Sequence, residues 1–191
     1  MAWPPCVLDI FSSLYVRTPY VKMKIKVYEV PVFKMNDEGY MRLALEEAQK
    51  AHQKDEVPVG AVVVRDGKVI AKAHNLRETK KDPLAHAELL AIKKAAKKLK
   101  GWRLAGCTLY ITLEPCPMCA GAVVNARIPR VVYAAKDPKA GALGSVCDLN
   151  EGRLNHTAEV TSGVLKDPAS ALLKRYFKNK RKRSVADGMQ R

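Results

Sequence analysis

Two short motifs place metal-binding and proton-carrying side chains at fixed spacing. His86 and Glu88 flank Ala87, and Cys116 and Cys119 stand three residues apart in the run Pro-Cys-Pro-Met-Cys. Two thiolates and a neutral imidazole are ligands that Zn²⁺ prefers, and three protein ligands leave a fourth tetrahedral position for water. A carboxylate beside that water can accept its proton and pass it on. The pattern predicts a catalytic zinc site with His86, Cys116 and Cys119 as ligands and Glu88 as proton shuttle.

Neither motif is specific by itself. A Cys-x-x-Cys pair also serves thioredoxin-type redox chemistry, and a His-x-Glu triplet usually carries no function. A structural zinc site would use a fourth protein ligand, and the sequence offers no second cysteine pair or suitably spaced histidine for it. The two motifs together, each expected at the start of a helix, favour the catalytic site.

Hydrophobic periodicity and turn residues predict the elements that position these motifs. Asn36 caps a helix that ends near Gln53, and Asp66-Gly67 forms a type I′ turn between two hairpin strands. Strand–helix–strand alternation in the second half requires parallel neighbours. The expected fold is a three-layer α/β/α domain with a central mixed five-stranded sheet, covering residues 36–173. Its strands are expected at 57–64, 69–73, 107–113, 130–135 and 157–162, and its later helices at 83–100, 115–126 and from 168 onward.

The composition limits the class of protein and its partners. The 191 residues are 48% hydrophobic and 28% charged, which fits a globular chain, and charges interrupt every apolar stretch, so no membrane span is expected. Five cysteines are too few and too unevenly spaced for a disulfide framework, which favours a cytoplasmic protein. Of the net charge of +15, +7 falls in the basic C-terminal helix end and tail, residues 174–191, so the charge is densest there. This bias predicts a nucleic-acid partner, with a solubilising tail as the alternative.

Residues 1–35 form an N-terminal extension to which no function is assigned. Residues 21–28 alternate apolar side chains with lysines, which is the period of a half-exposed strand, and Pro31 then breaks the pattern. Met23 and Met35 are alternative start sites. The extension is therefore an accessory strand, a disordered segment or the result of a start placed too early.

From about residue 37 to residue 183 the chain resembles the bacterial tRNA-specific adenosine deaminases. His-x-Glu followed by Pro-Cys-x-x-Cys is the signature of zinc nucleobase deaminases. The resemblance extends to the stretches EVPVGAVV at 56–63, HAE at 86–88, TLEPCPMCAGA at 112–122, GALGS at 141–145, NH at 155–156, and LL and YF at 172–173 and 176–177.

The resemblance implies a cytidine-deaminase-like fold, a homodimer with one zinc ion per subunit, and conversion of adenosine to inosine at the wobble position of a tRNA anticodon stem-loop. It supports the zinc ligands and Glu88 named above. Asn75 resembles the family's base-reading asparagine; the alternative is a turn residue. Asp137 and Lys139 are expected to contact flanking nucleotides, although an ordinary Asp-Pro turn is equally compatible with the sequence. The further residues assigned to substrate binding are Pro58, Ala87, Asn155 and Phe177.

Two other functions remain open at this point. Pro117 in the cysteine motif also occurs in guanine deaminases, so a zinc-dependent deaminase of a free base or nucleotide is the first alternative. The second is a non-catalytic zinc module that binds nucleic acid. Glu88 argues against it, because a structural site does not use a carboxylate there.

Phe177 is expected to stack on a base, with packing against the domain as the alternative. We expect the lysines at 93, 94, 97, 98 and 100 to form a solvated helix face, and the basic residues at 174, 175, 178, 180 and 181 to contact phosphates.

Overall fold

The computed structural model describes residues 35–188, with side chains to residue 183, so the segment 1–34, including the alternating stretch 21–28, lies outside the described residues. None of the described helices is long and apolar enough to cross a membrane. The elements are α1 (Asp37–Gln53), β1 (Gly60–Arg65), β2 (Lys68–His74), α2 (Arg77–Lys80), α3 (Ala87–Leu99), β3 (Cys107–Leu113), α4 (Pro117–Asn125), β4 (Arg130–Ala135), β5 (Glu159–Ser162) and α5 (Lys166–Gly188).

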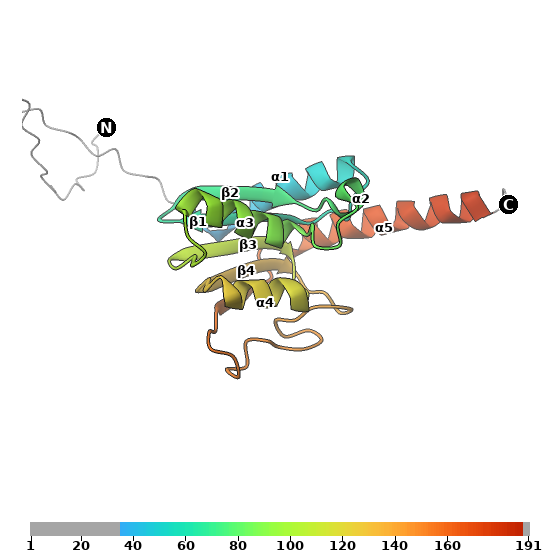
Figure 1. The fold of residues 1–191 in the computed structure, drawn as a ribbon. Helices are drawn as coiled ribbons and strands as arrows, with labels where there is room; N and C mark the ends of the chain where they lie inside the picture. Colours follow the sequence, from blue (N-terminus) through green and yellow to red (C-terminus); the bar gives the residue numbers. More distant parts are fainter. Residues whose placement is uncertain (1–34, 189–191) are drawn as a thin grey trace, which may run out of the picture. The chain divides into compact units, whose positions relative to one another are not determined.

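The five strands form one mixed sheet in the order β2-β1-β3-β4-β5. β1 pairs antiparallel with β2 and β3, whereas β3–β4 and β4–β5 are parallel pairs. One buried cluster joins the sheet to α3 and α4, and a second joins the opposite face to α1 and α5 (Figure 1). The expected three-layer α/β/α architecture with a mixed five-stranded sheet is confirmed.

Close packing holds α1 against the start of β1. The Asn36 side chain accepts a hydrogen bond from the Gly39 N–H and caps the helix as expected. A Cβ at Gly60 would overlap the Ala44 carbonyl oxygen, so glycine allows the helix backbone to touch the strand. The Gly60 N–H donates to the Thr112 hydroxyl at 3.1 Å, which fixes β1 to β3 at the same point.

The hairpin turn has the predicted conformation. Asp66 and Gly67 have φ angles of 50° and 72°, and both central residues of a type I′ turn need positive φ. The Tyr40 hydroxyl donates to the Gly67 carbonyl at 2.8 Å and ties the turn to α1.

Several element boundaries differ from those expected. α3 begins at Ala87 and not at Pro83, because the Asp82 carbonyl accepts the Ala85 N–H and closes a turn that precedes the helix. The short helix α2 replaces part of the loop expected before it. α4 begins at Pro117, and α5 begins at Lys166, two residues before Pro168; proline is tolerated in a first helical turn.

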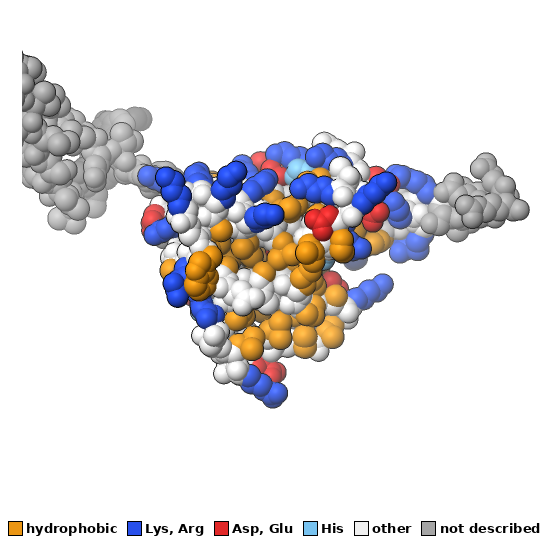
Figure 2. Space-filling model, in the orientation of Figure 1, with side chains coloured by type: hydrophobic (Ala, Val, Ile, Leu, Met, Phe, Trp, Pro, Cys, Tyr) orange, Lys and Arg blue, Asp and Glu red, His pale blue; other side chains and the backbone are white. Residues whose placement is uncertain are grey.

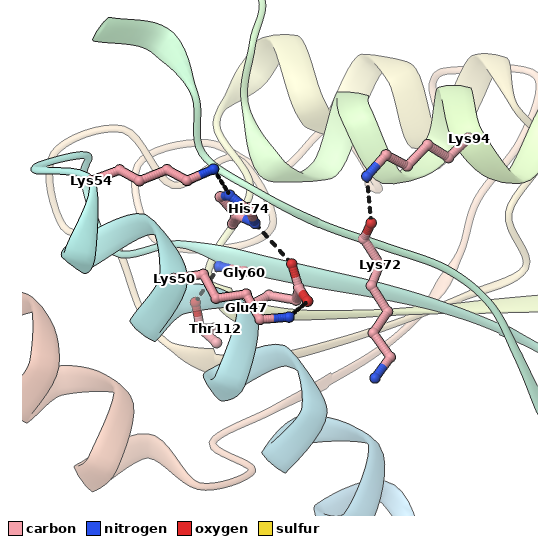
Figure 3. Close-up of polar contacts among 8 residues, drawn as sticks. All are labelled: Glu47, Lys50, Lys54, Gly60, Lys72, His74, Lys94 and Thr112. Atoms are coloured by element: carbon pink, nitrogen blue, oxygen red, sulfur yellow. Dashed lines mark hydrogen bonds and ion pairs between the residues drawn. The ribbon is translucent and has the colours of Figure 1, made fainter. Parts of the chain in front are cut away.

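β2 lies at one edge of the sheet, beside α3. The Lys94 ammonium on α3 donates to the Lys72 carbonyl of β2 at 2.8 Å (Figure 3). A backbone acceptor at this edge therefore has a side-chain partner from the helix that covers it.

Candidate active site

His86, Cys116 and Cys119 converge to one point. Their ligand atoms all lie within 4.8 Å of one another, and they are the one group of this kind found among residues 35–183. The His86 Nδ1 atom lies 3.8 Å from the Cys116 sulfur and 3.6 Å from the Cys119 sulfur. Ligands at ordinary zinc distances in a tetrahedron stand about 3.5 Å apart, so the donor set and its spacing fit Zn²⁺.

Two helix N-termini bring these ligands together. His86 is the N-cap of α3 and Cys116 is the N-cap of α4, and neither side chain caps its own helix. The side chains are therefore left to meet each other. The unpaired N–H groups and the positive end of each helix favour a thiolate at this position.

The protein groups at the site polarise one another. The hydrogen bond from Cys119, aided by His86, lowers the pKa of the Cys116 thiol to about 4. The same bond to Cys116, together with burial, raises the pKa of Cys119. The hydrogen bond with Cys116 raises the pKa of His86. The three groups thus share protons that a metal ion would displace.

Glu88 lies in the first turn of α3, one residue beyond Ala87 and close to the ligands. Its side chain is buried, and burial raises its pKa, whereas the nearby His86 opposes the rise. The nearby Cys119 also opposes the rise in the pKa of Glu88. A carboxyl group whose environment favours the protonated form, beside a metal-binding cluster, is suited to accept and return a proton.

Glu114 organises the loop that follows β4. Its buried carboxylate accepts hydrogen bonds from the backbone N–H groups of Asp137 (3.1 Å), Leu143 (3.1 Å) and Ser145 (3.0 Å) and from the Ser145 hydroxyl. A Cβ on Gly141 would lie 2.5 Å from the carboxylate carbon, so the loop closes tightly around the side chain. The Ala142 N–H in turn donates to the Pro115 carbonyl, directly before Cys116. Glu114 therefore supports the loop next to Cys116 through its backbone. Within the described residues, its hydrogen bonds go to the loop and not to His86, Cys116 or Cys119.

Glu56 performs a similar task for the short helix α2. Its buried carboxylate accepts the Thr79 N–H at 2.7 Å and so fixes α2. Although burial opposes ionisation, backbone donors from Thr79, Glu78 and Arg77 hold the pKa of Glu56 below its ordinary value. Sequence reasoning assigned Glu56 no such part, because its partners lie more than twenty residues along the chain.

The predicted substrate-binding residues occupy different environments. Asn75, Pro58 and Ala87 are buried. The Asp137 carboxylate accepts the backbone N–H groups of Lys139 and Ala140, as in an ordinary Asp-Pro turn, and Lys139 itself is exposed. These contacts favour the turn alternative for the Asp137 side chain.

Asn155 and Phe177 lie on the surface. The Asn155 side chain accepts from Arg127 at 2.7 Å, and Phe177 is 43% exposed while its ring edge packs on Tyr176. The contact with Tyr176 agrees with the packing alternative, and stacking of the exposed part of the ring on a base stays a prediction.

α5 is fastened to the loop before β1. The Tyr176 hydroxyl donates to the Asp55 carbonyl at 3.0 Å, and the Asp55 carboxylate pairs with Lys180 at 3.0 Å and Arg183 at 3.1 Å. Lys180 therefore has an acidic partner. The other basic residues expected to contact phosphates are exposed and have no acidic partner within the described part of the chain: Lys174, Arg175, Lys178 and Arg181.

Comparisons of the sequence with known proteins identify deaminases. The family model described as MafB19-like deaminase matches residues 35–181. A tRNA-specific adenosine deaminase of Bacillus subtilis is 54% identical over 151 residues, covering 78% of this chain and 94% of the relative. One of Haemophilus influenzae is 48% identical over 147 residues, covering 76% and 85%.

The similar solved structures include both a tRNA deaminase and a guanine deaminase. A structure from a study of A-to-I editing by tRNA:A34 deaminases at the wobble position is 45% identical, with a TM-score of 0.68, and covers 71% of this chain and 99% of its own. A guanine deaminase from Bacillus subtilis is 44% identical, with a TM-score of 0.51, and covers 53% and 66%.

Proposed function

The chain belongs to the tRNA-specific adenosine deaminases, and from this premise we propose that it converts adenosine to inosine at the wobble position of a tRNA anticodon. The observation that carries the proposal is the meeting of His86, Cys116 and Cys119 beside the buried Glu88, in a chain 54% identical to a named tRNA deaminase over most of its length.

The three ligands would hold one zinc ion in each subunit. When bound, zinc lowers the pKa of a coordinated water and so supplies a nucleophile at neutral pH. The remaining chemistry belongs to the protein. Addition of water across the C6–N1 bond of adenosine requires a group that moves one proton from the water to the ring nitrogen. Departure of ammonia requires the same group to move the second proton, from the new C6 hydroxyl to the leaving amine, as the C6 carbonyl forms. We assign this role to Glu88, because the candidate metal ligands lie beside it and its own environment favours the protonated carboxyl.

Substrate recognition is assigned to two sets of residues. Asn75, Pro58 and Ala87 are buried, and we assign them to the pocket for the flipped base. We assign Lys139, Asn155 and Phe177, with the backbone of the turn at Asp137, to the flanking nucleotides. The unpaired cations of α5 are available for phosphates, and an exposed aromatic ring offers a stacking surface to an unpaired base.

We assign the partner surface of a homodimer to the outer side of α4. Figure 2 has hydrophobic side chains gathered over α4, and basic side chains gathered over β2 and α3. A hollow of about 490 Å³ lies at this surface, lined by Gly121, Val124, Asn125, Arg153, Leu154 and Asn155. Leu154 is 44% exposed.

Sedimentation should give a dimer that Val124→Glu converts to a monomer; an unchanged dimer would place the interface elsewhere. A cytoplasmic location is part of the same proposal, because tRNA is found there.

The substrate can be tested directly. Zinc-loaded protein is incubated with a tRNA anticodon stem-loop and, in parallel, with free guanine, cytosine and adenosine. Inosine is measured as an A-to-G change on reverse transcription, and deamination of the small molecules as released ammonia. We expect inosine at the wobble position alone, and its formation should be at least about a hundredfold slower with Glu88→Gln. Ammonia from a free base with unchanged tRNA would retain the deaminase chemistry and refute the tRNA substrate.

A further inference from the structure

A charged cluster lies on the face of the sheet opposite the zinc ligands, at the point where β2 ends. Glu47 on α1 is buried, with a relative exposure of 6%, among side chains that otherwise form an apolar helix face. Its carboxylate accepts from the His74 Nδ1 atom at 2.8 Å and from the Lys50 ammonium at 2.6 Å (Figure 3). Lys54 adds a contact of 3.1 Å to the His74 Nε2 atom. We call these four residues the Glu47–His74 clasp.

The proton positions in the clasp follow from its donors. The Lys54 ammonium can only donate, so His74 Nε2 accepts and Nδ1 carries the hydrogen that goes to Glu47. The histidine is thereby bound on both ring nitrogens. A buried carboxylate is costly unless it is paired, and an apolar residue would fill the same space at lower cost. This cost points to a further reason for its presence, besides the stability that the paired carboxylate contributes.

The place of the clasp supplies that reason. His74 is the last residue of the edge strand β2, and its pairing with Gly60 is the last step of the β1–β2 ladder. The ends of elements at the edge of a fold open at lower free energy than its core strands. The clasp fastens this end to α1, and α1 is itself held against β1 by the close approach at Gly60.

Asn75 is the next residue after the clasp. Strand alternation puts Ala73 and Asn75 on the face opposite His74, and Ala73 is buried in the cluster that contains α3. The Asn75 N–H donates to the Val59 carbonyl at 3.1 Å, and the Leu76 N–H donates to the Ala85 carbonyl, directly before His86. The backbone that carries Asn75 is thus fixed between the clasp and the metal-binding segment.

We propose that the Glu47–His74 clasp positions Asn75 for recognition of the target base, acting through the end of β2 from the opposite face of the sheet. This inference rests on the proposed function, in which Asn75 contacts the base. Glu47 and His74 are positioning residues, since neither has a recorded contact with a zinc ligand.

The test is a double-mutant cycle on kcat/KM for the anticodon stem-loop, with the melting temperature of each variant measured alongside. Glu47→Leu should lower kcat/KM by about tenfold to a hundredfold, because misplacing a substrate-positioning group by about 1 Å has effects up to that size. Glu47→Gln keeps an acceptor for His74 and should stay within about threefold of the wild type. In an Asn75→Ala background, Glu47→Leu should cost less than about twofold, because coupled positions are not additive.

Glu38→Gln is the matched control, since Glu38 is an exposed glutamate on the same helix, paired with Arg42. It should change neither kcat/KM nor the coupling. If Glu47→Leu does not fold, His74→Gln probes the same link from β2 and should give the same non-additivity with Asn75→Ala. An equal loss in both backgrounds would overturn the inference and leave the clasp a stabilising feature.

The two proposals fail in different ways. If the wild type deaminates a free base and leaves tRNA unchanged, the tRNA substrate is refuted, and the same cycle on that base still decides whether the clasp acts through Asn75. If the wild type edits tRNA and Asn75→Ala has wild-type kcat/KM, the base contact of Asn75 and the role of the clasp are both refuted, while the substrate stands.

Discussion

Replacing Glu114 should weaken the protein in a graded way that depends on which hydrogen bonds survive. One carboxylate oxygen accepts from the N–H groups of Leu143 and Ser145, and the other accepts from the Asp137 N–H and the Ser145 hydroxyl. In Glu114→Gln the amide nitrogen must face one of these pairs. It can face the second pair at lower cost, because the Ser145 hydroxyl can turn and accept, and then only the Asp137 N–H loses its partner.

The magnitudes follow from this count. Leaving one buried donor unpaired costs about 1–3 kcal/mol, so Glu114→Gln should lower the free energy of unfolding by about that amount. Glu114→Ala removes the acceptor for three backbone N–H groups and should cost about 3 kcal/mol or more. The loop also holds the Pro115 carbonyl next to Cys116, so zinc affinity should fall roughly tenfold in Glu114→Ala, the lower end of the range for supporting partners of metal ligands.

Urea unfolding at a fixed zinc concentration measures the first quantity, and transfer of zinc to a coloured chelator measures the second. Glu151→Gln is the matched control, because the Glu151 side chain is 57% exposed and pairs with Arg153 on the surface; it should change neither. The free energy of unfolding of Glu114→Ala could instead lie within about 0.5 kcal/mol of the wild-type value, which is the usual effect of a surface substitution. In that case the loop would not depend on this carboxylate. A larger loss for glutamine than for alanine would refute the hydrogen-bond argument itself.

Three other substitutions have defined outcomes. Glu88→Gln should keep zinc content and tRNA binding and lower turnover by about a hundredfold to ten-thousandfold, the usual contribution of a positioned proton carrier; inosine formation at wild-type rate would exclude that role. Phe177→Ala should weaken anticodon stem-loop binding by roughly fivefold to a hundredfold if the exposed ring stacks on a base, and an unchanged Kd would leave the ring a packing residue. Burial opposes ionisation of Glu47, but its bonds to Lys50 and His74 hold its pKa below the ordinary 4.5, so it stabilises the fold above that pH and the contribution is lost as pH falls through the lowered pKa. Glu47→Gln should therefore lose less unfolding free energy than the wild type between about pH 6 and pH 3, and parallel losses in pH-dependent urea unfolding would contradict the assignment.

The parts of the site that sequence predicts are those set by local spacing. Cys116 and Cys119 share a helix face because they are three residues apart, and the parallel order of β3 and β4 follows from the strand–helix–strand alternation. The type I′ turn at Asp66-Gly67 is equally local. These features depend on backbone geometry over a few residues, which the amino-acid types determine.

The features that sequence did not predict depend on contacts between distant segments. Proline favours a first helical turn, so the sequence predicts that α3 begins at Pro83, yet Asp82 closes a separate turn there and the helix begins at Ala87. α2 has no strong cap of its own and is held by Glu56, far upstream. The partners of Asp37 include Tyr110 and Arg130, at separations of 73 and 93 residues. No periodicity in the chain encodes such pairs.

The contact between Lys94 and the Lys72 carbonyl has a consequence for how copies of this protein behave at high concentration. An edge strand with free backbone acceptors is a template on which another chain can add a strand and begin an aggregate. Here a positive charge occupies one such acceptor, and Lys68 and Lys72 add further charge along β2. To pair with β2, a neighbouring strand would have to displace the Lys94 ammonium group and lie among the positive charges of these lysines. We therefore expect the lysines of α3 and β2 to disfavour the addition of a strand from another molecule at the β2 edge of the sheet, which leads into Asn75.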